Sequence, residues 1–113
     1  MSTQHTPPRA DRHNAGKLQW SLVDYAALQP MVEVLEAGAR KYSADNWRKG
    51  LPTTEVCESL LRHLYAYLEG QDDDPETGLP HVGHILCNAM FLSHMHLERP
   101  DCDTRRGKHN PQP

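Results

Sequence analysis

Residues 80–98 read PHVGHILCNAMFLSHMHLE, and this stretch decides the fold. A proline suits the first turn of a helix, and Pro100 lies just beyond the last residue, so the pattern predicts one helix over the whole stretch. At about 100° per residue, His81, His84 and Asn88 fall on one narrow strip of this helix. Apolar side chains border the strip on both sides, namely Phe91, Met95, Ile85 and Leu92. We therefore expect the three polar groups to face the interior.

The polar strip requires partners in the folded protein. A buried imidazole or amide without a partner costs on the order of 1–3 kcal/mol. One interpretation is a metal ion or ligand held inside the bundle. The other is a satisfied hydrogen-bond network with a purely structural role. This helix alone leaves both interpretations open.

Two further helices precede this one. Apolar residues at helical spacing predict a helix from about Pro30 to Tyr42 and another from Thr53 or Thr54 to about Gly70. No strand-like alternation appears, so the predicted fold class is all-α, a small bundle of three main helices. The expected buried stripe of the second helix is Val56, Leu60, Leu61, Leu64, Tyr67 and Leu68, with Leu64 at its centre.

The two ends look unfit for a core. Residues 1–16 and 99–113 hold prolines and charged residues with few apolar side chains, so we expect disordered, flexible termini. The helical domain is then 17–98, near the size at which a lone core is only marginally stable. Burial against a second copy would supply the missing stability. We therefore expect a homo-oligomer.

Composition excludes several classes of partner. The net charge of −3 gives no general basic surface, so we expect no nucleic acid duplex as a partner. The sequence begins with no apolar signal region, and no stretch approaches membrane-spanning length, so we expect a cytoplasmic protein that does not bind membranes. Cys57 and Cys87 fall inside apolar helical patterns, which is typical of buried thiols that act as small hydrophobes.

An acidic turn joins the second and third helices. Residues 70–79 contain three aspartates and a glutamate, and His63 on the second helix can reach toward the third. Carboxylates at this density favour Mg²⁺ or Mn²⁺, although acidic surface loops are also common without an ion. Glu55 and Glu58 have the Glu-x-x-Glu spacing of helical metal sites, but they lie opposite the leucines. Whether they join the site stays open.

A second set of residues suits a nucleotide. Lys41 and Tyr42 are followed by Asn46 and Trp47, and rings beside cations can stack on a base and pair with phosphates. The alternative is ordinary packing, in which the rings close the core and the cations are solvated at a helix C-terminus.

Taken in order, five motifs resemble the domain at the N-terminus of bacteriophage dATP/dGTP diphosphohydrolases. The resemblance spans about residues 11–92. The motifs are Gly16-Lys17 with Trp20, Gly38 to Tyr42, Asn46 to Gly50, Arg62-His63 and Gly70 to His84. The resemblance implies a small helical fold, a purine deoxynucleoside triphosphate substrate, a divalent metal and release of pyrophosphate. It also implies a host cytoplasm if the chain is encoded by a phage.

The resemblance assigns roles to particular residues. The catalytic residues would be His63, Asp74 and Glu76; the metal ligands would be Asp74, Glu76, His81 and His84; the nucleotide contacts would be Lys17, Lys41, Tyr42, Asn46 and Trp47. Helical pyrophosphatases of the MazG type use a Glu-x-x-Asp pair where His81 and His84 stand in this chain. Two alternatives therefore accompany the enzyme reading, a catalytically silent nucleotide-binding protein that sequesters a signalling nucleotide, and a structural Zn²⁺ site.

Overall fold

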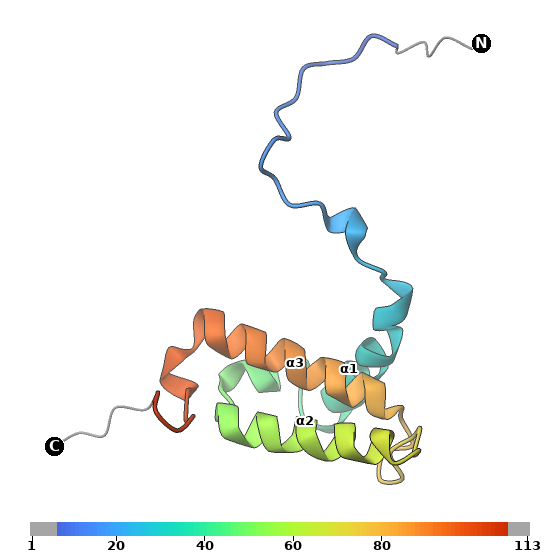
Figure 1. Ribbon diagram of the computed structural model, residues 1–113, viewed down its shortest axis with the longest axis vertical. Coiled ribbons are helices and arrows are strands. Elements are labelled where there is room, and N and C mark those ends of the chain that lie inside the picture. Colours follow the sequence, from blue (N-terminus) through green and yellow to red (C-terminus); the bar gives the residue numbers. More distant parts are fainter. Residues whose placement is uncertain (1–6, 109–113) are drawn as a thin grey trace, which may run out of the picture.

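Three α-helices form the fold, and their bounds lie within two residues of those that the sequence predicts. The computed structural model describes residues 7–108, and within that range the helices are α1 (Gln29–Lys41), α2 (Thr53–Leu68) and α3 (His81–Glu98), as Figure 1 shows. Four short 3-10 turns accompany them: η1 (Trp20–Leu22), η2 (Ala26–Leu28), η3 (Asn46–Lys49) and η4 (Pro100–Cys102). The described range holds no strand, which confirms the all-α prediction.

α3 is the central helix of the three. It packs against α2 on one side, with the two helices antiparallel, and against α1 on another (Figure 1). Gly83 allows α1 to approach closely, because a Cβ at this position would overlap the backbone carbonyl of Pro30. One turn further along α3, the Cys87 thiol donates to the Met31 carbonyl at 3.3 Å. The contact between α1 and α3 is therefore partly a contact between backbones.

The predicted buried stripe of α2 is wrong for most of its members. Leu61, Leu64 and Leu68 are 55%, 44% and 78% exposed, and Tyr67 is 46% exposed. The hydrogen bonds from α2 to α3 come from Ser59 and His63 instead, and Val56 is the one member of the predicted stripe that is buried. The physical reason is polar pairing, since the hydrogen bonds from Ser59 and His63 to α3 fix the rotation of the helix and leave its leucines outside.

The interior of the described residues is small. Three apolar side chains, Val56, Cys87 and Met95, are buried there. Burial raises the pKa of the Cys87 thiol to about 11, so this residue behaves as the small hydrophobe that the sequence indicates. All three cysteines are free thiols.

The segment after α3, for which the sequence predicted a flexible tail, folds back over the start of α2. The guanidinium of Arg99 donates to the Lys49 carbonyl at 2.9 Å. The Thr104 hydroxyl accepts from the Thr54 amide at 3.1 Å, and the Thr104 amide donates to the Thr53 hydroxyl at 3.0 Å. The bond from the Thr54 amide satisfies a group at the start of α2 that would otherwise lack a partner. The predictions for residues 1–6 and 109–113 lie outside the described residues.

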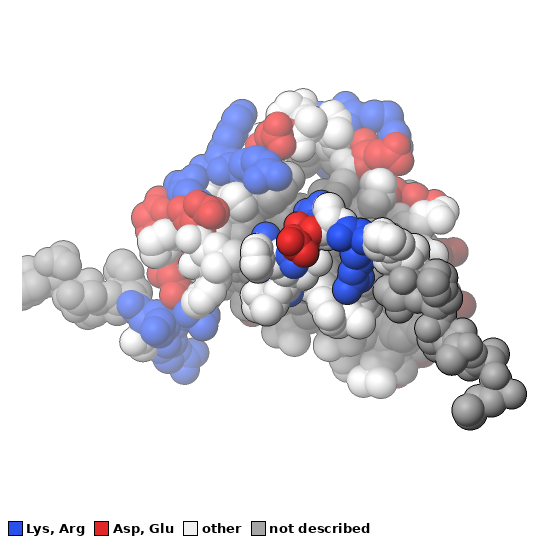
Figure 2. All heavy atoms as spheres, turned by 90° about the horizontal axis from the view of Figure 1, so that it is seen from above, with Lys and Arg blue, Asp and Glu red and all other residues white. Residues whose placement is uncertain are grey.

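Residues 7–28 reach away from the three helices as an arm (Figure 1). Apart from Leu28, each of these residues is exposed, and the apolar ones include Leu18, Trp20 and Leu22. In the view of Figure 2, acidic and basic side chains are interspersed with uncharged ones and form no large area of one sign. Within residues 7–108, no helix has the length and apolar character needed to cross a bilayer.

Candidate metal and nucleotide site

Three potential metal ligands meet where α2, the acidic loop and α3 come together. The ligand atoms of His63, Asp74 and His84 all lie within 4.8 Å of one another, and all three residues are half-buried. His63 comes from α2, Asp74 from the loop and His84 from the second turn of α3. We call these three residues the His63 cluster.

The loop holds Asp74 in place through its own backbone. The Asp74 amide donates to the Leu79 carbonyl at 2.8 Å, and the Gly78 amide donates to the Asp74 carbonyl at 2.7 Å. Gly78 has a φ of +73°, which a residue with a side chain rarely adopts. The carboxylate of Asp74 then accepts from the Thr77 hydroxyl at 3.0 Å. Pro75 and Gly78 thus shape a tight turn that places the Asp74 carboxylate beside α2 and α3.

The contacts of His81 fix which nitrogen of His63 is free. His81 Nε2 lies 2.7 Å from the amide oxygen of Gln71, which can only accept, so this nitrogen carries the proton. When both rings are neutral, His81 Nδ1 is then an acceptor, and His63 Nδ1, 2.9 Å away, donates to it. His63 Nε2 is left with an unprotonated lone pair. A free lone pair is what a metal ligand requires, and His81 itself lies outside the cluster.

His84 occupies a different hydrogen-bonding position. Its Nε2 lies 2.9 Å from the Thr77 hydroxyl and 3.6 Å from Asp74 Oδ2. The single proton of that hydroxyl goes to Asp74, so His84 Nε2 donates to Thr77 in the metal-free state. The His63 and His84 rings stack in parallel, with centroids 4.2 Å apart. A cation in place of the proton on His84 Nε2 would be able to contact all three side chains of the cluster.

Burial and neighbouring charge shift the pKa values of the cluster. Burial lowers the pKa of both His63 and His84, and the charge of Asp74 opposes that shift in each. Burial alone would raise the pKa of Asp74, but hydrogen bonds from Thr77 and from the Glu76 amide lower it below its ordinary value. At neutral pH the cluster therefore offers two uncharged imidazoles and one carboxylate, the form in which all three bind metal.

The structure brings together some of the predicted ligands and not others. Glu76 is exposed on the loop, and His81 is buried behind His63. Neither belongs to the His63 cluster. Glu55 and Glu58 are exposed on α2 and also lie outside it.

Two polar residues of this site, Thr77 and Gln71, were not predicted from the sequence. The sequence signal for Thr77 is partial, because Asp, Pro and Gly mark a turn around it in which short polar side chains form local hydrogen bonds. Gln71 has none, since only the fold brings its amide to His81. The Asn88 amide donates to the Ser59 hydroxyl at 3.2 Å, which gives the third member of the predicted polar strip a partner across the helix interface.

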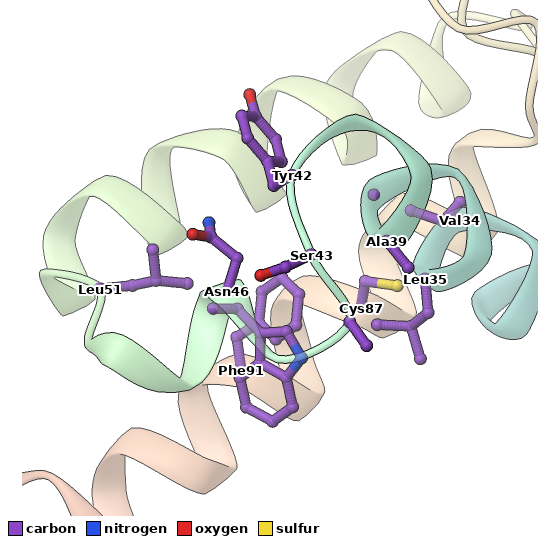
Figure 3. Close-up of a pocket in the computed structure, with 12 residues that line it drawn as sticks. Val34, Leu35, Ala39, Tyr42, Ser43, Asn46, Leu51, Cys87 and Phe91 are labelled. Carbon is purple, nitrogen blue, oxygen red and sulfur yellow. The ribbon is translucent and has the colours of Figure 1, made fainter.

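A separate pocket lies beside α1. Its volume is about 240 Å³, and side chains from α1, from the segment 42–51 and from α3 surround it (Figure 3). Most of its lining is apolar, with Tyr42, Asn46 and Trp47 among the polar or aromatic members. Three of the predicted nucleotide contacts therefore line one cavity.

The Trp47 ring already has neighbours within the chain. Phe91 stacks on it with centroids 4.8 Å apart, and the Arg48 guanidinium lies 4.4 Å from its centroid. Tyr42 is 64% exposed, with the Lys41 ammonium 5.2 Å from its ring. Of the two predicted stacking residues, Tyr42 thus has the more accessible ring.

These features accompany a clear match to known sequences. The family described as dATP/dGTP diphosphohydrolase, N-terminal, matches residues 7–105. The chain belongs to this family. A relative from Salmonella phage PMBT28, named dATP/dGTP diphosphohydrolase, is 33% identical over 95 residues. That match covers 84% of this chain and 32% of the relative, so the chain spans about a third of the relative's length. No solved structure matches the chain.

In this family member, the pocket and the His63 cluster share no residue. Cys87 and Phe91 line the pocket on the side of α1, whereas His84 and Asn88 face α2. Lys17, the fifth predicted nucleotide contact, is exposed on the arm. The predicted site is therefore divided into three parts within one chain.

Proposed function

We propose that this chain is a metal-dependent diphosphohydrolase of purine deoxynucleoside triphosphates. The observation that carries the proposal is the His63 cluster, in which α2, the acidic loop and α3 each contribute one potential metal ligand. Membership of the dATP/dGTP diphosphohydrolase family supports the substrate class, as does the name of the phage relative.

The donor set fits a divalent transition metal. Two imidazole nitrogens and one carboxylate oxygen suit Mn²⁺ and its neighbours, whereas Mg²⁺ prefers oxygen ligands throughout. Of the two ions expected from the sequence, Mn²⁺ therefore suits His63, Asp74 and His84 better. The same donor set also suits Zn²⁺. When bound, the ion would neutralise phosphate charge and lower the pKa of a coordinated water.

Other residues of the chain would bind the nucleotide and accept the proton of the attacking water. Tyr42 would stack on the purine, and Lys41 beside it would pair with a phosphate oxygen. Glu76, exposed two residues after Asp74, would accept a proton from the attacking water. The water oxygen bonds to the α-phosphorus while the bond from that phosphorus to the bridging oxygen breaks. Pyrophosphate then leaves with the electron pair.

Product analysis tests this proposal directly. The protein is incubated with each deoxynucleoside triphosphate and Mn²⁺, and the products are separated by chromatography. We expect deoxynucleoside monophosphate and pyrophosphate from dATP or dGTP, and no turnover after EDTA treatment. Orthophosphate without pyrophosphate would contradict cleavage between the α- and β-phosphates. Unfolding of the protein by EDTA would instead support a structural metal.

A second function has one observation in its favour. The residues that line the pocket that would hold the base include none of the His63 cluster. A single chain that only binds and sequesters a nucleotide needs the pocket but not the cluster. Calorimetry distinguishes the two functions, because nucleotide binding that persists in EDTA, without turnover, supports the silent binder.

A further inference from the structure

The outer surface of α2 carries an apolar face that nothing covers in the described chain. Leu61, Leu64, Tyr65 and Leu68 are 55%, 44%, 66% and 78% exposed. The four lie within two turns of one helix. We call them the α2 face. Exposed apolar surface gathered in this way is typical of an interaction site.

The arm carries a second apolar surface. Leu18, Trp20, Leu22 and Tyr25 are 79%, 66%, 80% and 61% exposed. The arm keeps local order nonetheless, since the Tyr25 hydroxyl donates to the Trp20 carbonyl at 3.3 Å. It therefore presents a shaped apolar strip away from the three helices (Figure 1).

Charge favours pairing between the arm and the α2 region. Residues 53–79 hold seven acidic side chains and one basic side chain, whereas residues 7–28 hold three basic and two acidic ones. The basic residues of the arm, Arg9, Arg12 and Lys17, all precede its apolar part. The carboxylates gather in the loop that follows the α2 face. Two copies of the arm, or two copies of the α2 region, lack this complementarity.

We propose that the arm of one chain covers the α2 face of a second copy, and that the exchange is reciprocal in a twofold dimer. A reciprocal exchange buries both apolar surfaces on both chains and closes the assembly at two copies. The charges direct the basic half of the arm toward the partner's acidic loop. Lys17 then lies beside the partner's cluster; only this last step, the use of Lys17 on phosphate, rests on the proposed function.

Tryptophan fluorescence tests the exchange in solution. The chain has two tryptophans, and Trp47→Phe leaves Trp20 as the single reporter. We expect Trp20 emission to shift to the blue as protein concentration rises, in step with dimer formation measured by sedimentation. Emission that is blue-shifted while sedimentation shows a monomer would show the arm folded onto its own chain and would overturn the proposal. A monomer at high concentration would also overturn it.

Mixing two defective chains tests which surfaces meet. Both chains carry Trp47→Phe. The first chain also carries Leu64→Asp, so its α2 face is defective but its arm keeps Trp20. The second chain carries Trp20→Ser, so its arm is defective but its α2 face is intact. Neither should dimerise alone by sedimentation, but mixing them should restore the blue shift of Trp20. No shift on mixing would overturn the exchange, as would a stable dimer of the Trp20→Ser chain, which would show that two α2 faces meet directly.

A control and a second readout keep the test independent of folding and activity. Leu97→Ser alters an α3 side chain that is 72% exposed and lies outside both surfaces, so dimerisation should be unchanged. Sedimentation of Leu68→Ser in the chain with both tryptophans needs no change at Trp47 and should show a monomer. A dimer that forms but does not turn over nucleotide would count against the proposed function alone.

Discussion

His63 and His81 lie with their Nδ1 atoms 2.9 Å apart, so one ring must donate to the other. Gln71 holds the far nitrogen of His81 as a donor, and the chain of contacts therefore ends in a free lone pair on His63. A residue outside the cluster thus sets the protonation of a residue inside it. This relationship makes His81 a positioning residue in the proposed site.

Changing His81 should weaken metal binding without removing a ligand. His81→Phe keeps a ring of similar shape but lacks the acceptor for His63, and loss of such outer partners typically costs ten- to a hundredfold in metal affinity. Titration of Mn²⁺ followed by electron paramagnetic resonance measures the change. His96→Phe, at an exposed position of the same helix, is the matched control and should bind as the wild type does. Equal affinities in both variants would contradict the positioning role.

Replacing His84 separates catalysis from stability. His84→Asn keeps a polar side chain but removes an imidazole nitrogen from the cluster, so activity should fall at least about tenfold if a ligand is lost. The fold should survive, as followed by circular dichroism. Both quantities are measured on the same variant. A protein that is destabilised but fully active would assign His84 to the structural network and remove it from the site.

Stability of the metal-free protein should depend on pH. Because burial lowers the pKa values of His63 and His84, the unfolded chain takes up protons near pH 6.5 that the folded chain does not. The free energy of unfolding should therefore fall as pH drops from about 7 to 5, and Asp74 should add a loss of the same sign only below about pH 4. Urea unfolding at several pH values measures this.

The double variant His63→Asn/His84→Asn isolates the contribution of the cluster to that slope. Its free energy of unfolding should change less than that of the wild type between pH 7 and pH 5. Parallel curves for the two proteins would mean that other histidines cause the dependence.

Met95→Ala should cause the largest loss of stability of any change at a core position. Met95 is 1% exposed, and truncation of a buried Met typically costs about 2–5 kcal/mol. Leu97→Ala on the same helix removes a side chain that is 72% exposed and should change stability by no more than about 0.5 kcal/mol. Chemical denaturation of both variants at one concentration provides the comparison. Similar losses in the two would mean that the orientation of α3 is wrong.

The sequence predicted the three helices well because their apolar spacing and their flanking prolines are local signals. It also placed His81 and Asn88 in the interior correctly. It failed on the rotation of α2, because six apolar residues suggested a core that the hydrogen bonds of Ser59 and His63 overrule. Leu64 is therefore a position for testing association rather than core packing.

The candidate site was only partly predictable for a similar reason. The spacing of charged residues indicated the acidic loop and the neighbouring histidines. It did not indicate which of these side chains lie close together in the folded chain. The pocket is lined by residues of α1, of the segment 42–51 and of α3, whereas the cluster combines residues of α2, the acidic loop and α3. Pairing between helices distant in sequence has no local signature.

Gly83 ties the spacing of two helices to the chemistry of the next residue. A side chain at this position would push α1 away from α3, and His84 would move with the displaced backbone. Evolution therefore cannot change this glycine without also displacing the histidine. Among related chains that keep the histidine, we expect glycine at this position without exception. Chains that have lost the histidine should keep the glycine as well, because a Cβ would still meet the Pro30 carbonyl.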